Sequence, residues 1–347
     1  MSTKLEPAPQ GAGTAGAVGA PREETLSTRV HDLLHRNATL GPLFVLLLAI
    51  VYFSITADRL LAPANLSLIV QQVMVVGTLG IAQTLVILTA GIDLSVGAIM
   101  VLSSIVMAKL SADQGLPGLL ALLLGFTAGT ACGFINGALI TRLRLPPFIV
   151  TLGTLNVFFA INLWFSKSET VRGTDMSSLL LWTGNTINLG DTQITYGSIL
   201  MLVLFAVFAW VLKNTAWGKH VYAVGDDAEA ARLAGVRKDR VLLSVYIVAG
   251  LICAVAGWML IGRIASASPQ AGVSANLDSI TAVVIGGTSL FGGRGRLIGT
   301  LFGALIVGVL RNGLTLTGVD VLWQDFAVGI LIIVAVAIDQ WIRKVKA

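Results

Sequence analysis

The run "VLLSVYIVAGLICAVAGWMLIG", residues 241–262, holds no charged side chain in 22 consecutive positions. A helix needs about 20 apolar residues to cross roughly 30 Å of bilayer hydrocarbon, so this run predicts a transmembrane helix. The whole chain is 55% hydrophobic and only 12% charged, with a mean hydropathy of +0.86. Soluble domains carry about twice that share of charge. The sequence therefore predicts an all-α polytopic membrane protein.

Nine further apolar segments resemble this run. They cover residues 37–57, 60–92, 94–108, 116–141, 145–166, 192–212, 279–293, 297–310 and 321–338. We therefore predict about ten transmembrane helices in a permease domain over residues 37–347. Residues 1–36 are rich in Pro, Gly and Ala and lack the apolar core of a signal peptide, which predicts a flexible cytoplasmic tail.

The basic residues predict which side of the membrane each end occupies. Ten helices place both termini on one side, and with that topology 17 of the 23 Lys and Arg residues share the side of the termini. The other side keeps Arg59, Lys109, Lys167, Arg172, Arg263 and Arg311. The positive-inside rule makes the richer side cytoplasmic. The net charge of +5 therefore reflects topology in a lipid membrane and requires no nucleic-acid partner.

The sequence offers little for catalysis. The three histidines, His31, His35 and His220, fall in predicted cytoplasmic segments, and Cys132 and Cys253 fall inside apolar runs. Nucleotide-binding, zinc-binding and nucleophile motifs are absent from the sequence. We therefore expect no enzyme activity, no metal and no cofactor in this chain.

A strongly charged stretch, "GKHVYAVGDDAEAARLAGVRKDR" at 218–240, directly precedes the apolar run at 241–262. Asp226 and Glu229 have capping-box spacing, or Asp227 is the cap and Glu229 only complements the helix dipole. Gly235 is placed to end this helix in the left-handed conformation. The resulting helix of about eight residues is too short and too polar to cross a membrane. A plain solvated connector would not need such caps, which favours docking into another protein.

The segment "LTAGIDLSVGAIM", residues 88–100, has two interpretations. Gly91 ends one helix and Asp93 caps the next, which starts at Leu94. Alternatively, a broken helix pair lines a transport path here, and Asp93 governs its cytoplasmic mouth.

Other polar groups in apolar runs are candidates for a path that carries a neutral, hydroxyl-rich cargo. Glycines recur every fourth residue from Gly125 to Gly137, which predicts close helix packing beside Asn136. The segment 148–169 adds four more candidates, Asn156, Phe159, Asn162 and Trp164. Amides can bind sugar hydroxyls and aromatic faces can cover sugar rings. The alternative is an interfacial Trp belt with asparagines in the bundle core.

Four blocks of the sequence resemble the ribose-type permeases of bacterial ATP-binding cassette (ABC) sugar importers. They are "LVILTAGIDLSVGAIM", "LPPFIVTLGTL", "GKHVYAVGDDAEAARLAGV" and "ITAVVIGGTSLFGGRGRLIGTLFGALIVGVLRNGLTL", in that order between residues 85 and 316. Within that family, "FSKSETVRG" at 165–173 is more similar to the fructose and ribose branches than to the galactose or arabinose branches.

This resemblance implies the ABC importer permease fold and a monosaccharide cargo. It also implies a permease homodimer, an extracytoplasmic sugar-binding protein and cytoplasmic subunits that hydrolyse ATP and contact residues 213–240. The coupling residues would be Asp226, Glu229, Ala230, Arg232 and Gly235, with Asp227 as the alternative cap. The competing class is a stand-alone secondary sugar transporter or facilitator, which would leave the capped helix unexplained.

Overall fold

The computed structural model describes residues 40–272 and 274–344, and in this part of the chain thirteen α-helices make up nearly all regular structure. The predicted tail at 1–36 lies outside the described residues. The helices are α2 Leu40–Thr56, α3 Pro63–Leu88, α4 Val96–Ala112, α5 Gly118–Arg142, α6 Pro147–Ser166, α7 Ser178–Leu181, α8 Tyr196–Asn214, α9 Ala216–Asp226, α10 Ala228–Leu233, α11 Lys238–Ile264, α12 Ala275–Ile285, α13 Leu297–Leu316 and α14 Val321–Lys344.

Ten of these helices overlap the ten predicted apolar segments. Among the described residues, α3, α5, α6, α8, α11 and α13 are long and apolar enough to cross a membrane. Four more apolar helices, α2, α4, α12 and α14, are shorter in their apolar part. The all-helical class is confirmed.

The boundaries of α12 and α13 differ from the prediction. We expected α12 over 279–293, but it covers 275–285 because Gly286 is its C-cap and Gly287 has a φ of +80°. Eleven residues make a helix of about 16 Å, about half the hydrocarbon thickness, so α12 is not a full span. Helix α13 runs to Leu316, six residues beyond the predicted end, and so includes Arg311.

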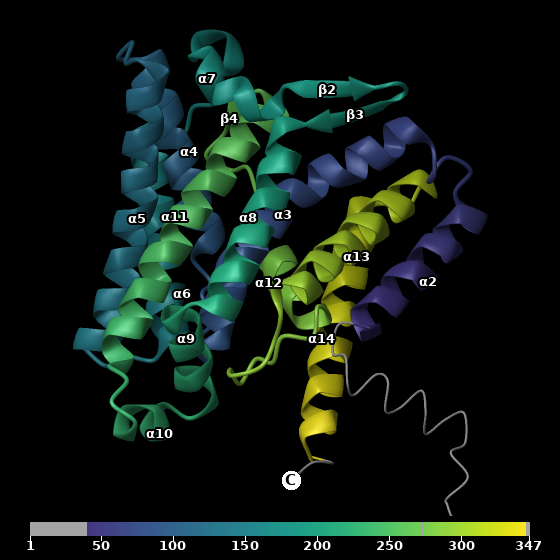
Figure 1. Ribbon diagram of the computed structural model, residues 1–347. Coiled ribbons are helices and arrows are strands. Elements are labelled where there is room, and N and C mark those ends of the chain that lie inside the picture. Colours follow the sequence, from purple (N-terminus) through teal and green to yellow (C-terminus); the bar gives the residue numbers. More distant parts are fainter. Residues whose placement is uncertain (1–39, 273, 345–347) are drawn as a thin grey trace, which may run out of the picture. The chain divides into compact units, whose positions relative to one another are not determined.

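Short strands join the helices at one end of the bundle. Strands β2 (Thr186–Leu189) and β3 (Thr192–Thr195) form a hairpin, and β1 (Val171–Arg172) pairs with β4 (Ser266–Ala267). Helix α8 starts at Tyr196, later than predicted, because the Thr195 side chain caps it by accepting from the Ser198 amide. Figure 1 shows α7 and the hairpin at the upper end, and α9, α10 and the last turns of α14 at the lower end.

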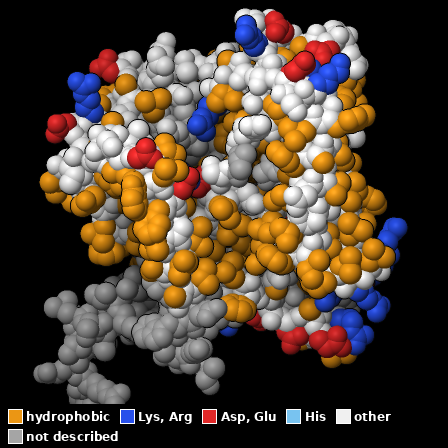
Figure 2. Space-filling view, turned by 180° about the vertical axis from the view of Figure 1, so that it is seen from behind, with side chains coloured by type: hydrophobic (Ala, Val, Ile, Leu, Met, Phe, Trp, Pro, Cys, Tyr) orange, Lys and Arg blue, Asp and Glu red, His pale blue; other side chains and the backbone are white. Residues whose placement is uncertain are grey.

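Glycines allow the central helices to pack closely. A Cβ on Gly133 of α5 would overlap the Tyr246 backbone of α11, and a Cβ on Gly129 would lie 2.7 Å from the Gly250 carbonyl oxygen. This confirms the predicted packing face of α5. Figure 2 shows hydrophobic side chains covering a broad band of one face, with clusters of charged side chains above and below it. Such a band suits lipid tails rather than water.

Candidate functional site

Helix α10 is defined by residues next to it in sequence. The Asp227 carboxylate accepts from the backbone amides of Glu229 and Ala230, both at 2.9 Å. Gly235 ends the helical segment with a φ of +87°. Asp227 is therefore the N-cap, and the capping box with Asp226 is wrong because Asp226 is the last residue of α9. The helix has six residues rather than about eight.

The outer surface of α10 is exposed to solvent. Arg232 Nε donates to both Glu229 carboxylate oxygens, at 3.1 and 3.0 Å, and this exposed pair lowers the pKa of Glu229. Ala231 is buried against the rest of the chain, whereas Ala230 faces outward. Leu233 is 76% exposed and is a large apolar side chain on the outer surface of this helix. Helix α10 thus presents one ion pair and one apolar side chain to its surroundings.

Helix α9 fixes α10 to the membrane helices through backbone contacts. Gly225 lies so close to the end of α3 that a Cβ there would overlap the Leu88 carbonyl oxygen and lie 2.7 Å from the Gly293 nitrogen. Gly293 itself donates to that same Leu88 oxygen at 3.0 Å. Tyr222 adds a hydrogen bond from its hydroxyl to the Gly295 carbonyl, at 2.8 Å. The ends of α3 and α9 and the glycine-rich loop after α12 therefore form one interlocked contact.

A cavity of about 1010 Å³ opens beside α10. Its walls include Glu229 and Arg232 of α10. Four more basic residues line it, Arg144, Arg237, Lys238 and Arg240. Gly91 and Tyr246 line its inner part. A Cβ on Gly91 would lie 2.9 Å from the Tyr246 hydroxyl oxygen, so these two lining residues lie close together.

Asp93, Ser95 and Asn136 form a buried polar cluster. The Asp93 carboxylate accepts from the Ser95 amide at 2.7 Å and from the Ser95 hydroxyl at 2.6 Å. Asn136 of α5 donates to the Ser95 hydroxyl oxygen at 2.8 Å. All three side chains are at most 1% exposed. Both helix ends predicted here are wrong: α3 ends at Leu88, with Thr89 rather than Gly91 as its C-cap, and α4 starts at Val96, with Ser95 rather than Asp93 as its N-cap. Asp93 does not cap α4 because its carboxylate accepts from the amide and hydroxyl of Ser95, before the helix begins.

Distant helices hold the non-helical segment between α3 and α4, residues 89–95, in place. Thr151 of α6 donates to the Ile92 carbonyl at 3.0 Å, and Asn276 of α12 donates to the Leu94 carbonyl at 2.6 Å. The Oδ1 atoms of Asn136 and Asn276 and the Tyr246 hydroxyl are buried without a hydrogen-bond partner among the described residues. The non-helical segment between α3 and α4 therefore combines a fixed backbone with nearby unpaired polar atoms.

The four candidates on α6 do not join this cluster. Asn162 is buried and donates to the Pro269 carbonyl at 2.8 Å. Phe159 is half-buried, and Trp164 is 78% exposed. Asn156 is exposed and donates only to the Leu152 carbonyl of its own helix, at 3.0 Å. The structure brings Asn136 to Asp93 but leaves these four spread along α6.

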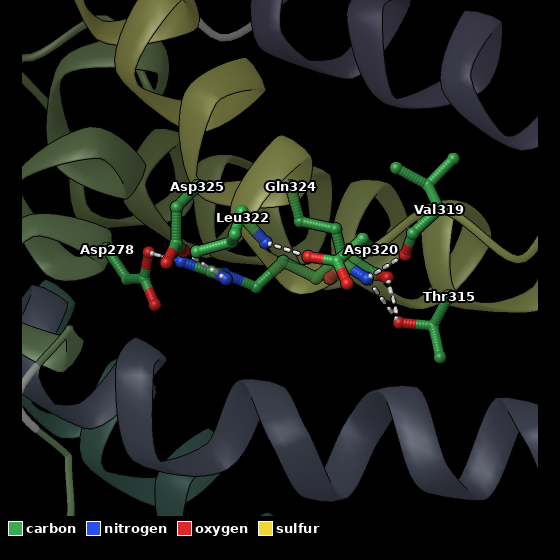
Figure 3. A network of polar contacts seen from close by, with 8 residues as sticks. Asp278, Thr315, Val319, Asp320, Leu322, Gln324 and Asp325 are labelled. Atoms are coloured by element: carbon green, nitrogen blue, oxygen red, sulfur yellow. Dashed lines mark hydrogen bonds and ion pairs between the residues drawn. The ribbon is translucent and has the colours of Figure 1, made fainter.

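An ion network that the sequence analysis missed joins α12, α13 and α14. Arg311 donates to Asp278 at 2.7 Å and to Asp325 at 3.0 Å, and Figure 3 shows both carboxylates facing one guanidinium group. Nearby, Asn65 of α3 and Asn312 of α13 exchange two amide hydrogen bonds, at 2.9 and 3.0 Å. The signal available in the sequence was one basic and two acidic residues at the edges of apolar runs.

These features define a polytopic membrane transport component: apolar helices, a broken helix with buried polar groups, and an exposed capped helix. Residues 65–336 match a family model described as branched-chain amino acid transport system / permease component. The chain belongs to this family of permeases and is a multi-pass membrane subunit of a bacterial ABC importer. It is a non-catalytic transport subunit, which confirms the expectation that it is no enzyme.

Individual relatives extend the comparison. The chain is 53% identical to the fructose import permease protein FrcC of Rhizobium meliloti over 94% of this chain and 91% of that protein. It is 41% identical to the ribose import permease protein RbsC of Bacillus subtilis, over 87% and 92%. The D-allose transport system permease protein AlsC of Escherichia coli is 34% identical, over 88% and 92%. The predicted resemblance to ribose-type sugar permeases is confirmed.

Proposed function

We propose that this chain carries a monosaccharide of the fructose and ribose type across the cytoplasmic membrane into the cell. The support is the 53% identity to a fructose import permease along 94% of this chain, with ribose and allose permeases as further relatives. Fructose is the first candidate cargo because that relative is the most similar of the three. The unpaired amide and hydroxyl groups near the non-helical segment between α3 and α4 suit a neutral sugar.

The coupling surface of this permease is α10, and the ATP-hydrolysing partner docks there. One observation carries this proposal: an exposed capped helix is joined through Gly225 to the end of α3 without any side chain between the two backbones. Movement of α10 therefore displaces the α3 end directly. Leu233 enters an apolar groove of the partner, and the Glu229 and Arg232 pair sets the orientation.

The transport path passes the cluster of Asp93, Ser95 and Asn136, and Gly91 with Tyr246 forms its cytoplasmic gate. When the partner subunits close, α9 shifts against Leu88 and separates Gly91 from Tyr246. The cargo then leaves through the basic cavity beside α10. Asn162 and Phe159 are secondary path candidates nearer the outer end of α6, where Trp164 is a candidate membrane-interface residue.

The membrane orientation follows from the same proposal. The lower end in Figure 1, with α10 and the last turns of α14, is cytoplasmic. The ten helices predicted from the sequence place both termini on that same side. The hairpin end then faces an extracytoplasmic sugar-binding protein. Two copies of the chain form the membrane part of the transporter.

Reconstitution in proteoliposomes tests the proposal. We expect uptake of radiolabelled fructose only when the sugar-binding protein, the ATPase subunit and internal ATP are all present. Glu229→Lys or Arg232→Glu should lower copurification of the ATPase subunit roughly tenfold. The double swap Glu229→Arg with Arg232→Glu keeps the internal ion pair and tests whether the partner reads the charges. Uptake without the ATPase would show a stand-alone facilitator instead.

A further inference from the structure

One face of α6 is a continuous exposed stripe. Its residues follow the alternating spacing of three and one that keeps side chains on one side of a helix. They are Ile149, Leu152, Gly153, Asn156, Val157, Ala160, Ile161 and Trp164, and all eight are exposed. We call this set the α6 stripe.

Asn156 distinguishes the α6 stripe from the exposed face of α8. It lies at the middle of α6, in a helix of 20 residues. The exposed residues of α8 between Ile199 and Trp210, by contrast, are all apolar. A carboxamide that faces lipid without a full set of hydrogen bonds is unfavourable, and Asn156 bonds only to its own helix. The centre of the α6 stripe is therefore poorly suited to lipid.

The same stripe is shaped for close helix contact. Gly153 and Ala160 stand on either side of Asn156 along the helix, and nothing lies within 4 Å of the Cβ position of Gly153. Small residues let two helix backbones approach, and polar side chains between them then form interhelical hydrogen bonds. The stripe carries no charged side chain, so it does not match a charged partner.

We propose that the α6 stripe is the surface on which a second copy of this chain packs, with the two Asn156 amides pairing across the twofold axis. A carboxamide is both donor and acceptor, so it complements an identical group related by twofold symmetry. This chain already contains such a reciprocal amide pair between membrane helices, Asn65 with Asn312. The proposal rests on the two-copy assembly of the proposed function and names its contact surface.

A second exposed groove, between α5 and α11, lacks this feature. It is lined mainly by apolar residues, and its two hydroxyls, Thr127 and Thr130, already donate to carbonyls of their own helix at 2.8 and 2.7 Å. That groove has no outstanding donor and suits a lipid chain. It supplies a matched control for the α6 stripe.

Cysteine crosslinking in native membranes, with the whole transporter expressed, tests the proposal. The variants are Gly153→Cys and Asn156→Cys on the stripe, with Val203→Cys on α8 and Ala131→Cys in the groove as controls. Native Cys132 and Cys253 are buried, so the unmodified chain gives the background. We expect a mild oxidant to produce a disulfide-linked dimer from at least one stripe variant and from neither control. Dimer from the controls alone, or from none of the four, overturns the proposal.

Two further variants separate an interface role from a folding role. Asn156→Leu removes the amide but keeps the branching and the number of side-chain heavy atoms, and Asn156→Gln keeps the amide. We expect the dimer fraction in detergent to fall several-fold for Leu and to be largely retained for Gln, with the monomer still folded in both. Equal dimer fractions for Leu and the unmodified chain contradict the amide pairing. Crosslinking does not depend on ATP, so it can succeed even where ATP-driven uptake fails.

Discussion

Helices α10 and α12 are both too short to cross a membrane, yet opposite kinds of contact hold them. Helix α10 is bounded by Asp227 and Gly235, within two residues of its ends. The first turn of α12 is held by partners from far along the chain, Leu94 through Asn276 and Arg311 through Asp278. An exposed helix can be specified locally, whereas a helix that ends among other helices needs polar partners from them.

Loss of the ion pair between Asp278 of α12 and Arg311 should give the largest change in the free energy of unfolding. Arg311→Leu leaves the Asp278 side chain, 7% exposed, without its cation. Breaking a buried ion pair from one side is strongly destabilising, and because Arg311 is 22% exposed we expect the low end of that range, about 3 kcal/mol. Thermal unfolding in detergent measures it. The double variant Arg311→Leu with Asp278→Leu should recover most of the loss. A melting temperature unchanged in the single variant would contradict the role of this pair.

The second largest effect is expected at the contact of Gly225 with the end of α3, which holds α9 and α10 in place. Gly225→Ala places a Cβ against the Leu88 carbonyl and the Gly293 amide, and the resulting overpacking should cost about 2 kcal/mol. We also expect ATP-dependent uptake per folded transporter to fall, because the contact that transmits the movement of α10 to α3 is itself displaced. The control is Gly329→Ala on α14, where nothing lies within 4 Å of the Cβ position. If both variants transport alike, the direct backbone contact is not the coupling route.

The contrast also explains what the sequence could predict. The caps of α10 lie a few residues apart, so spacing alone limited the N-cap to Asp226 or Asp227. Asn136 and Ser95 are 41 residues apart, and Asp278 and Arg311 are 33 apart. Their contacts depend on how whole helices pack, which local patterns do not encode. The prediction of α12 failed for a related reason, since its apolar run continues into the glycine-rich loop that ends it.

The cap of α10 should have a smaller and strictly local effect. Asp227→Ala removes the acceptor for two backbone amides, which typically costs about 1 kcal/mol of helix stability. We expect ATPase copurification to fall roughly fivefold, the factor that about 1 kcal/mol represents. The global melting temperature should not change, because no buried contact is lost. Asp227→Asn should behave like the unmodified chain, and Asp226→Ala should leave the cap intact.

The smallest effect concerns the exposed pair on α10. Arg232 lowers the pKa of Glu229 from its usual 4.5. The stabilisation from this ion pair is therefore fully present above pH 4.5 and is lost only as the pH falls through the lowered pKa. We therefore expect the ATPase affinities of the unmodified chain and of Glu229→Gln to follow parallel profiles from about pH 5.5 to 8. They should converge only at more acidic pH, where Glu229 becomes neutral. Profiles that diverge within the neutral range would mean that the partner, rather than Arg232, determines the charge state of this carboxyl.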